Sequence, residues 1–529
     1  MGLKRGVWHV SRECEGIAEA GGLKDVVAGL AAALAGAGIA TAVVLPRYGF
    51  IDLDRLRAQK AGQGFDLMLP TENRASPLAV ETVEVYSCEL KGVPVFLLDS
   101  PRTRSKRAIY TYTAEDEHED PYKKKGTGHW DAHHINLILQ RGALELALRL
   151  GGPDVFHCHD GHSAFLPAMM KGVARYREKL RDCRALITIH NAGKGYHQEI
   201  YDREFAAQLT ELPGELLEKG MLGGAVDPFL VGARFATVNT VSEGYAREIN
   251  SGQLDELTGG LGTGLKKAGV ELLGITNGIA PETFDPRFPE NTGLPFSFDP
   301  SRGKLEGKEA CRQRFIELLA AGGDSRGPEL NGLEIHGSLS PDQPLPLYTF
   351  VGRLTGQKGV DVLAGAFSRL LEKRAGWRLL VLGQGERAIE EKLIEMTRLP
   401  RAAGKLCVLI GYNNLAARYL YASGDFFLVP SRYEPCGLTD LFAQMMGNLP
   451  IVHAVGGLIK VRDGSTGYSY REHSIPALVK AVEKSLSDYR NRRGHLLRLQ
   501  KQAFQEVYKH YTWEKVLRKG YLPLYGLEG

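Results

Sequence analysis

The sequence predicts an α/β protein made of two doubly wound parallel sheets with a cleft between them. Apolar, strand-like runs alternate with helix-like segments along the whole chain, as in parallel sheets that helices cover on both faces. The 529 residues are too many for one hydrophobic core. Residues 287–305 are rich in Pro, Gly, Ser and Asn, a composition typical of a linker between domains.

The composition argues against several classes of protein. Hydrophobic residues make up 43% and charged residues 24% of the chain, which is typical of a soluble globular protein. The formal net charge of +4 is small for this length, and no basic run is interleaved with aromatic residues, so we expect no nucleic-acid partner. No apolar run approaches the roughly 18 residues that a membrane span needs, so we expect no membrane partner.

The cysteines and the N-terminus indicate a compartment. The seven cysteines are scattered and include no C-x-x-C pair, which argues against a disulfide framework and against a zinc site. MGLKR leads directly into the strand-like GVWHVS, which leaves no room for a signal or transit peptide. We therefore expect a cytoplasmic protein.

The chain opens with a strand, a glycine turn and a helix. Residues 6–14 are strand-like, residues 18–39 contain the turn and an apolar helix, and residues 41–48 are the next strand. Gly21 and Gly22 stand at the start of the helix, where glycine lets backbone amides approach a phosphate or a sugar closely. Close packing of a helix on a sheet also requires glycine, so the pair alone does not decide between the two roles.

A less regular region follows. Residues 80–90 and 92–99 alternate like the strands of a hairpin. Residues 102–130 form a polar loop that is too long for a mere connection. A helix is predicted over residues 131–150.

Polar residues follow the later strands of this half. His157, His159, Asp160 and His162 lie just beyond a short buried strand, and His190 ends another strand. Clustered histidines suggest a metal site, but side chains from a strand and from the turn after it point in different directions, and no second group of acids has ligand spacing. We therefore expect no metal. Several polar strand ends are instead expected to converge on one edge of the sheet.

The second half repeats the α/β pattern around the stretch SRYEPCGLTD (431–440). This stretch follows a buried apolar run that ends at Pro430, which is typical of a strand-to-helix junction at the carboxyl edge of a parallel sheet. Glu434 can accept hydrogen bonds from hydroxyls, and the amides that open the next helix can bind oxygens or an anion. The other predicted segments are 307–322, 346–373, 378–396, 407–412, 450–457 and 475–488.

Short motifs extend this pattern over nearly the whole chain. The second half contains GRLTGQKG (352–359), VLGQGE (381–386) and GGL (456–458), and the first half contains EAGGLKDV, HCHDGH, TIHN, NTVS and ITNG. In this order they resemble the motifs of the glycogen and starch synthases, which are retaining GT-B glycosyltransferases with a nucleotide-diphosphoglucose donor. The final segment, residues 511–525, resembles the closing helix that crosses back to the first domain in that family.

The resemblance implies a GT-B fold, in which two Rossmann-like domains face each other across a cleft. An acceptor-side domain is expected over residues 1–290, a nucleotide-sugar-binding domain over 305–505, and a segment that crosses back over 506–529. No metal and no cofactor are implied, since the nucleotide-diphosphoglucose is a substrate. The expected partners are ADP-glucose or UDP-glucose and an α-1,4-glucan acceptor.

The resemblance also implies roles for the matching residues. Arg353 and Lys358 would grip the donor diphosphate, and Glu434 would meet the sugar or ribose side of the donor. Asp160 and His190 would line the glucose pocket. These five are the expected catalytic residues. The expected donor-binding residues are Gly21, Gly22, Asn277, Arg353, Lys358, Cys436, Gly437, Leu438 and Thr439.

The chemistry of these residue types agrees with such roles. A leaving diphosphate gains charge as the glycosidic bond breaks, and two cations on one loop stabilise that charge where it develops. No pair of acids is arranged like the acid and nucleophile of a hydrolase, so we expect front-face transfer assisted by the leaving phosphate. The leading hypothesis is an α-1,4-glucan synthase that adds glucose to the non-reducing end of its acceptor with retention.

Three departures from the family pattern bear on activity. Glu19 stands where the family has a lysine two residues before the glycine pair, and Gly161 stands where it has a tryptophan. Residues 459–461, Ile-Lys-Val, replace Ala-Asp-Thr in a shortened segment. Lys24 lies about one turn into the helix and is expected to point elsewhere, so Glu19 should either swing away from the phosphates or weaken donor binding.

Two alternatives follow from these departures. A GT-B transferase with another donor or acceptor would share the fold, because a fold does not fix a substrate. A glucan-binding regulatory protein that has lost catalysis would be consistent with Glu19. Nucleotide release from ADP-glucose or UDP-glucose in the presence of glycogen would separate the three hypotheses.

Overall fold

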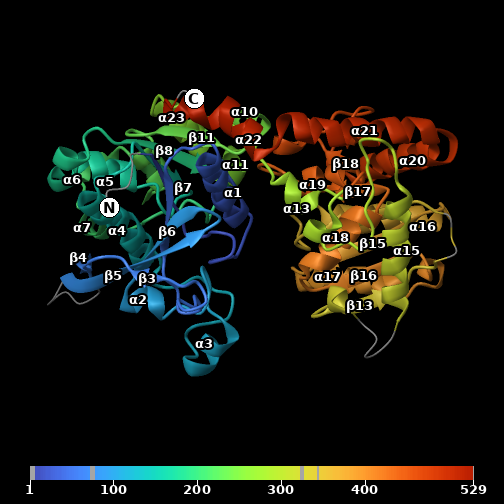
Figure 1. Cartoon of the computed structure of the whole chain (residues 1–529), viewed down its shortest axis with the longest axis horizontal. Helices are drawn as coiled ribbons and strands as arrows, with labels where there is room; N and C mark the ends of the chain where they lie inside the picture. The colour runs from blue at the N-terminus through green and yellow to red at the C-terminus, as the bar shows by residue number, and fades with distance from the viewer. Residues whose placement is uncertain (1–5, 72–77, 322–326, 342, 344, 528–529) are drawn as a thin grey trace. The chain divides into compact units, whose positions relative to one another are not determined.

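The computed structural model describes residues 6–71, 78–321, 327–341, 343 and 345–527. The chain forms two compact units, each built on one large sheet (Figure 1). Unit 1 comprises Met1–Gly278 and Val516–Gly529, and unit 2 comprises Ile279–Lys515. The N-terminal residues 1–5, on which the expectation of no leader peptide partly depends, lie outside the described residues.

The structural breaks fall after Gly278 and after Lys515, whereas the sequence suggested domain limits at 290, 305 and 506. Residues 287–305, expected to be a linker, lie inside unit 2. Leu294 and Phe298 of this segment are buried in the hydrophobic core of that unit. Its Pro, Gly and Ser content therefore belongs to irregular but packed chain, which composition alone does not distinguish from a linker.

Unit 1 contains a ten-stranded sheet in the described part of the chain. Its strand order is β12-β11-β8-β7-β1-β2-β6-β5-β3, with β4 paired to β5. Neighbours from β12 to β6 run parallel. The strand β5 pairs antiparallel with β6, as the predicted hairpin requires, and also with β3 and β4. The strands are β1 (Val7–Val10), β2 (Thr41–Pro46), β3 (Gln59–Lys60), β4 (Phe65–Pro70), β5 (Leu78–Leu90), β6 (Val93–Asp99), β7 (Val155–His159), β8 (Arg184–Ile189), β11 (Thr237–Thr240) and β12 (Leu273–Gly274).

Helices cover this sheet, which explains why its central strands are continuous apolar runs. Every residue of β1 and β2 is buried, as expected for parallel strands with helices on both faces. Helices α1 (Leu23–Gly36) and α4 (Ala132–Leu150) both pack against β2. The other helices of this part are α5 (Leu166–Gly172), α6 (Ala174–Lys179), α7 (Arg203–Thr210), α8 (Gly214–Glu218), α9 (Pro228–Gly232), α10 (Glu243–Asn250), α11 (Asp255–Thr258) and α12 (Leu261–Lys267), beside the short hairpin β9 (Met221–Leu222) and β10 (Ala225–Val226).

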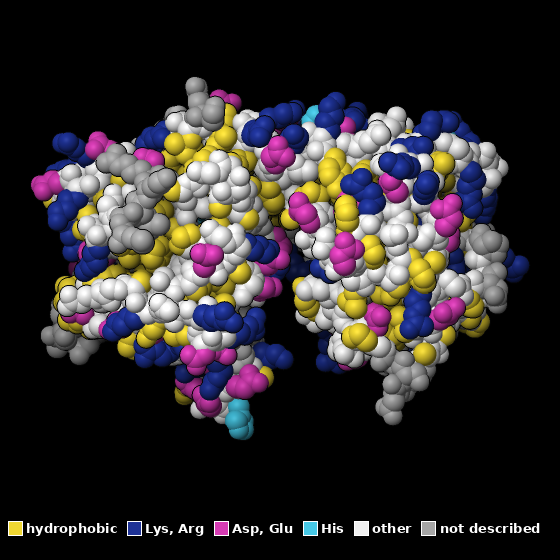
Figure 2. All heavy atoms as spheres, in the orientation of Figure 1, with side chains coloured by type: hydrophobic (Ala, Val, Ile, Leu, Met, Phe, Trp, Pro, Cys, Tyr) yellow, Lys and Arg dark blue, Asp and Glu magenta, His cyan; other side chains and the backbone are white. Residues whose placement is uncertain are grey.

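The segment 102–130 is more ordered than the predicted polar loop. It holds most of α2 (Pro101–Arg104) and all of α3 (Ala114–Glu119), which Thr113 starts with a capping box. Arg107 pairs with Asp116 and with Glu119. Figure 2 shows acidic and basic side chains interspersed over this part of the surface. Such alternating charges pair locally, so the segment presents no basic patch on the face that is shown.

Unit 2 contains a seven-stranded sheet among the described residues. Its order is β13-β16-β15-β14-β17-β18-β19, and all neighbours are parallel except β13 and β16. The strands are β13 (Glu334–Gly337), β14 (Leu347–Val351), β15 (Arg378–Gly383), β16 (Leu406–Ile410), β17 (Phe426–Val429), β18 (Leu449–His453) and β19 (Tyr468–Tyr470). The two sheets therefore confirm the predicted α/β class with mainly parallel strands.

Alternate residues of the strands in unit 2 belong to two separate cores. Leu379 and Val381 of β15 face one core, and Leu380 and Leu382 face the other. The helices are α13 (Pro281–Phe284), α14 (Pro289–Thr292), α15 (Glu306–Ala320), α16 (Val360–Glu372), α17 (Arg387–Thr397), α18 (Asn414–Ser423), α19 (Thr439–Met445), α20 (Ile475–Asn491) and α21 (Arg493–His510), with the turns η2 (Pro328–Leu330), η3 (Pro400–Ala402) and η4 (Gly456–Lys460). Both faces of the sheet are thus covered, which is the doubly wound arrangement.

The end of the chain packs into unit 1. After α22 (Trp513–Val516), it forms η5 (Leu517–Tyr521) and α23 (Leu522–Tyr525). Tyr521 and Tyr525 are fully buried, and the Tyr525 hydroxyl lies 2.8 Å from His157 Nδ1. All seven cysteines are free. No helix in the described ranges is long and apolar enough to cross a membrane.

Candidate active site

Three loops meet at the carboxyl edge of the sheet in unit 2. The strands β14, β17 and β18 are adjacent and parallel. The loop after β14 carries Arg353 and Lys358, the loop after β17 carries Glu434, and the loop after β18 leads into η4. We call these three segments the edge loops. They occupy the position where open α/β sheets bind ligands.

A glycine lets the first two edge loops approach each other. Gly359 has a φ of +69°, and a Cβ atom there would lie 1.9 Å from the carbonyl oxygen of Pro430. The absence of a side chain places the preceding residue, Lys358, against the second loop, where its Nζ lies 2.6 Å from Glu434 Oε2. The Ser431 hydroxyl donates to the same oxygen at 2.9 Å. Lys358 and Glu434, which the sequence predicted in separate roles, are therefore in direct contact.

The surroundings of Glu434 keep it ionised. Its side chain is buried, and burial acts to raise the pKa of the carboxyl, but the Lys358 ammonium and the Ser431 hydroxyl outweigh that effect and lower the pKa. Arg353 lies on the same loop as Lys358, and its guanidinium is exposed and donates to Gln357 Oε1 at 3.2 Å. The edge loops thus carry one exposed and one half-buried cation beside a buried carboxylate.

The predicted anion-binding residues lie at the start of α19. Leu438 is the residue that caps this helix, Thr439 is its first residue, and Cys436 and Gly437 form the turn before it. The carbonyl of Glu434 accepts a hydrogen bond from Gly457 N at 2.9 Å, which joins the GGL motif to this turn. The positions agree with the predicted helix start, while contact of these residues with a ligand stays a prediction.

Lys460 lies inside the same turn and was noted in the sequence only as a departure. Its Nζ donates to the carbonyls of Cys436 and Gly437 at 2.7 Å and of Gly457 at 3.0 Å, and it lies 3.0 Å from Asp440 Oδ1. Burial raises the pKa of Asp440 to about 6, against the effect of the ammonium. Lys460 therefore clamps two edge loops together. The one sign of this role in the sequence was that Lys460 replaces the aspartate of the family pattern.

In unit 1, Asp160 and His190 are joined at the ends of β7 and β8. Asp160 has a φ of +58°, and its Oδ1 accepts hydrogen bonds from the backbone amides of His190 at 2.7 Å and of Asn191 at 3.3 Å. Burial raises the pKa of Asp160 to about 7, although these two amides oppose the shift. The sequence-predicted glucose-pocket residues are therefore direct neighbours on one edge of the sheet.

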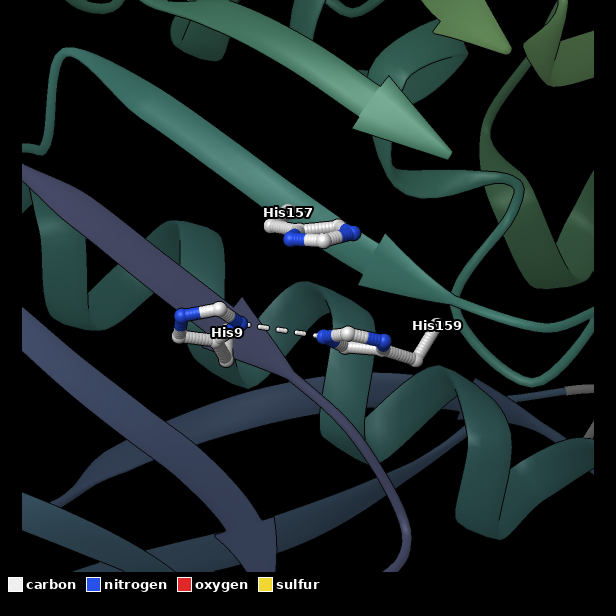
Figure 3. Close-up of side chains that lie close together, drawn as sticks. All are labelled: His9, His157 and His159. Carbon is white, nitrogen blue, oxygen red and sulfur yellow. Dashed lines mark hydrogen bonds between the residues drawn. The ribbon is translucent and has the colours of Figure 1, made fainter. Parts of the chain in front are cut away.

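Behind His190 lies a row of buried imidazole rings. His190 Nε2 lies 3.0 Å from His159 Nδ1. His159 Nε2 lies 3.0 Å from His9 Nδ1, the contact drawn in Figure 3. His157 lies beside them, with Nδ1 2.8 Å from the Tyr525 hydroxyl and Nε2 2.6 Å from Thr188 Oγ1. The sequence placed His157 and His159 just beyond this strand, whereas both lie within it. The contact of His159 with His9, from β1, was not foreseen.

His9, His157 and His159 could also be read as a metal centre, since one nitrogen of each lies within 4.8 Å of the others. However, both nitrogens of His157 and both of His159 already have partners. No carboxylate is part of the group to balance a divalent ion, and the three rings are fully buried. The geometry therefore fits a hydrogen-bonded cluster better than a metal site. The expectation of no metal stays a prediction.

The glycine turn before α1 is occupied by an acid that the sequence reading missed. Glu13 Oε2 accepts hydrogen bonds from Gly21 N at 2.6 Å and Ala20 N at 3.0 Å, and Tyr110 donates to Oε1 at 2.6 Å. The amide of Gly21, expected to face a phosphate, is therefore bound within the protein here. Gly22 precedes α1, and its surroundings are open. Glu13 ends the VSRE run after β1, and an acid directly after a buried strand was the available signal.

Glu19 folds back onto its own loop. Its Oε1 accepts a hydrogen bond from Gly16 N at 2.7 Å, and its Oε2 lies 3.8 Å from Lys24 Nζ. Lys24 also lies 2.6 Å from Asp25 Oδ1. Lys24, which was expected to point elsewhere than the phosphates, lies beside Glu19, because the short turn through the glycine pair brings the start of α1 over the loop.

Two further sequence positions can be placed in unit 1. Asn277 is buried, and its Oδ1 has no hydrogen-bond partner among the described residues, as a side chain that awaits a ligand would show. Gly161 faces the backbone of residues 196 and 197: a Cβ there would lie 2.1 Å from the carbonyl oxygen of His197. A tryptophan at this position would have no room in this structure.

Comparisons with known proteins match both halves of the chain. Residues 6–267 match the family model of the starch synthase catalytic domain, and residues 346–488 match that of glycosyl transferases group 1. The glycogen synthase of Vibrio cholerae serotype O1 is 28% identical over 98% of both chains. The glycogen synthase of Francisella tularensis is 27% identical over 97% of both chains.

A solved structure shares the fold. The catalytic domain of starch synthase IV from Arabidopsis thaliana, bound to ADP and acarbose, is 24% identical, with a TM-score of 0.78 and coverage of 99% of each chain. Two mainly parallel sheets in two units agree with its architecture. The predicted two-domain α/β GT-B fold is thereby confirmed.

Proposed function

Because the chain belongs to the glycogen and starch synthase family of GT-B glycosyltransferases, we propose that it transfers glucose from ADP-glucose or UDP-glucose to the non-reducing end of an α-1,4-glucan. The relatives that match over nearly the whole chain are named glycogen synthases. The starch synthase with the same fold was solved with ADP and acarbose, which supports a nucleoside diphosphate as the leaving group.

One observation carries the proposal: the Lys358 ammonium lies against Glu434. Lys358 is on the same loop as the exposed Arg353. Two cations on one loop suit a leaving diphosphate, because its negative charge grows as the bond to glucose breaks. Glu434 holds Lys358 in place before a ligand arrives and can accept a hydrogen bond from a sugar or ribose hydroxyl. The start of α19 adds backbone amides for phosphate oxygens.

We propose retention of configuration at the transferred glucose. Asp160 and His190 would bind glucose hydroxyls. We assign neither of them the role of the nucleophile or of the general acid that a hydrolase uses. The leaving phosphate would then take the proton of the acceptor hydroxyl on the same face of the sugar. The protein's part is to hold donor and acceptor in line and to stabilise charge.

The compartment and the need for other groups are part of the proposal. Seven free cysteines suit a reducing compartment, so we place the activity in the cytoplasm. The reaction needs no cofactor, since the nucleotide sugar supplies the energy of transfer. The residues offered to the diphosphate are cations and amides, which bind phosphate without a metal ion.

The test is nucleotide release from ADP-glucose and from UDP-glucose, each with and without glycogen. Glycogen-dependent release with either donor, together with an α-anomeric proton signal in the lengthened glucan, is the expected result. Release that requires another acceptor would favour a GT-B transferase of different specificity. Glycogen binding without release from either donor would favour a regulatory protein. The Lys358→Ala variant, made in parallel, shows whether any activity belongs to this chain.

A further inference from the structure

Three imidazole rings in unit 1 form a continuous hydrogen-bonded row from the core to the candidate glucose pocket. His9 comes from β1, His159 ends β7, and His190 follows β8. The two contacts, His9 Nδ1 to His159 Nε2 and His159 Nδ1 to His190 Nε2, are both 3.0 Å long. Figure 3 shows the first of them as a dashed line between the rings of His9 and His159. The row ends at His190 Nδ1, which has no hydrogen-bond partner among the described residues.

The three rings are neutral. Burial lowers the pKa of His9 and of His190 to about 3, and burial with neighbouring histidines lowers the pKa of His159 well below its usual value. A neutral imidazole carries one N–H and one unprotonated nitrogen. Each of the two contacts needs one proton. Only two arrangements therefore satisfy both, and they differ in the direction in which every ring donates.

In the first arrangement, His9 donates through Nδ1, His159 donates through Nδ1, and His190 carries its proton on Nδ1. In the second, all protons sit on Nε2, so His190 donates inward and its Nδ1 is a bare acceptor. The two differ at the inner end of the row. The second places an N–H on His9 Nε2, and the first leaves an unprotonated nitrogen there.

The inner end decides between them. His9 Nε2 is buried and has no hydrogen-bond partner in the described part of the chain. A buried N–H without an acceptor is rarer and costlier than an unfilled acceptor, because the donor loses a strong bond to water. The first arrangement is therefore favoured.

The neighbouring His157 does not disturb this direction. The Thr188 hydroxyl donates to Asn239 Oδ1 at 2.6 Å, so its oxygen accepts from His157 Nε2. His157 Nδ1 then accepts from the Tyr525 hydroxyl. Both nitrogens of His157 are used, and it offers nothing to the free nitrogen of His9.

We propose that His9 and His159 are positioning residues that hold the proton of His190 on Nδ1, so that His190 donates a hydrogen bond to a hydroxyl of the bound glucose. Asp160, whose Oδ1 accepts from the backbone amide of His190, then offers a carboxylate acceptor beside this donor once the acid ionises above about pH 7. A donor and an acceptor side by side match the two capacities of sugar hydroxyls. The proposal rests on the proposed function only for the identity of the sugar.

The direct test needs no activity. Two-bond proton–nitrogen correlation spectra of protein labelled with ¹⁵N-histidine distinguish the two tautomers of each ring, and the His190 signals are assigned by their loss in His190→Ala. The expected pattern for His9, His159 and His190 is a proton on Nδ1. A proton on Nε2 of His190 would overturn the proposal, whether or not the chain proves to be a glucan synthase.

Two variants at the inner end make the test sharper. The carboxylate introduced by His9→Asp can only accept, so it should pull the proton of His159 to Nε2 and reverse the row, leaving His190 protonated on Nε2. The matched variant His9→Phe offers no acceptor and should leave His190 protonated on Nδ1. A His190 tautomer that is the same in both variants would contradict control through His9.

Kinetics then connect the tautomer to the sugar. Reversal removes one hydrogen bond to the donor, so the KM for the nucleotide sugar should rise roughly tenfold in His9→Asp and change by less than about threefold in His9→Phe. Equal effects in the two variants would indicate a packing role alone. Zinc retained by the wild-type protein after dialysis, and lost in His9→Phe, would also overturn the proposal, because the metal would occupy the nitrogens of the row.

Discussion

The ammonium of Lys358 lies 2.6 Å from the carboxylate of Glu434, two residues 76 positions apart in the chain. The contact exists because Gly359 lets the backbone of the first edge loop touch Pro430. A buried carboxylate would otherwise be costly, and a lone lysine in a loop would be mobile. Each residue therefore fixes the other in the absence of a ligand, which is the preorganisation that stabilisation of the proposed diphosphate would require.

The first prediction is that Lys358→Ala, Glu434→Ala and Arg353→Ala each lower kcat severely while the fold is retained. Loss of one preorganised electrostatic contact typically costs about a hundredfold to a thousandfold. The matched control is Arg432→Ala, because Arg432 lies beside Glu434 in sequence but is exposed, and its closest acid, Asp361, is 3.9 Å away. Nucleotide release and circular dichroism are the measurements. Near-normal rates in all three variants would show that the edge loops are not part of the active site.

The second prediction concerns the buried pair of Lys460 and Asp440, whose side chains are 6% and 0% exposed. Lys460→Met leaves the Asp440 carboxylate buried without its cation, and such a loss typically lowers the free energy of unfolding by about 3 to 5 kcal/mol. Addition of Asp440→Asn removes the unpaired charge and should restore part of that stability. Urea unfolding measures both.

A control for this pair is available at the surface. Lys484→Met breaks an exposed contact with Asp463, for which about 1 kcal/mol or less is expected. If Lys460→Met were as mild as Lys484→Met, the clamp between the edge loops would contribute little. If the Lys460→Met, Asp440→Asn double variant regained stability but had a higher KM for the donor than the wild-type protein, Lys460 would also be needed to shape the turn before α19.

Local sequence predicted Glu434 and the strand before it, since an apolar run ending in proline and followed by a glycine turn specifies a strand-to-helix junction. It did not predict that Lys460 is buried, because a lysine in a loop normally keeps its charge in water. Three backbone carbonyls hold Lys460. Their positions depend on the path of the main chain, which residue types alone do not predict. The contact of His9 with His159 joins residues 150 positions apart, and depends on the order of strands in the sheet.

The third prediction follows from the pKa of Asp160, raised by burial from 3.8 to about 7. The folded state prefers the neutral acid, so the contribution of this group to stability is complete below its unfolded pKa and is lost as the pH rises through about 7. Between pH 5 and pH 8, the wild-type protein should therefore lose about 2 to 3 kcal/mol more unfolding free energy than Asp160→Asn. Urea unfolding of both at the two pH values is the measurement.

Burial raises the pKa of Asp440 as well. Asp440 is present in both proteins, so its effect on the unfolding free energy cancels when the two are compared. Parallel pH dependence in wild-type protein and Asp160→Asn would mean that Asp160 is already ionised at pH 5.

The fourth prediction is that Gly161→Ala destabilises unit 1. The new Cβ would lie 2.1 Å from the carbonyl oxygen of His197. His197 cannot easily move, because its ring is held between Asp227 at 2.7 Å and the carbonyl of Ala192 at 2.8 Å. Overpacking of this kind costs about 1 to 3 kcal/mol. Thermal and urea unfolding measure the loss.

Gly214→Ala is the matched control for that substitution, since a Cβ at Gly214 meets nothing within 4 Å and the residue begins α8. It should be neutral or stabilising by up to about 1 kcal/mol. Equal stability of Gly161→Ala and Gly214→Ala would show that the segment at residues 196 and 197 yields readily. The family tryptophan could then be accommodated at position 161 after all.

The last prediction is that Glu19→Lys tightens the binding of ADP or UDP. Glu19 stands where the family places a cation against the donor phosphates, but here its carboxylate binds Gly16 N and lies 3.8 Å from Lys24. A lysine at this position loses the hydrogen bond and is repelled by Lys24, so its ammonium should turn outward, toward a phosphate. At about 4 Å and an effective dielectric of about 20, a charge contact is worth on the order of 4 kcal/mol before solvent screening reduces it.

Glu19→Gln separates charge from shape in this experiment, because its amide oxygen can still accept from Gly16 N while the negative charge is gone. Titration calorimetry with ADP and with UDP should therefore give the tightest binding for Glu19→Lys, an intermediate value for Glu19→Gln and the weakest for the wild-type protein. In kinetics, Glu19→Lys should lower the KM for the donor more than it alters kcat, since the contact forms on binding. Unchanged or weaker nucleotide binding in Glu19→Lys would mean that this loop does not face the phosphates, and that the bond from Gly21 N to Glu13 persists when the donor binds.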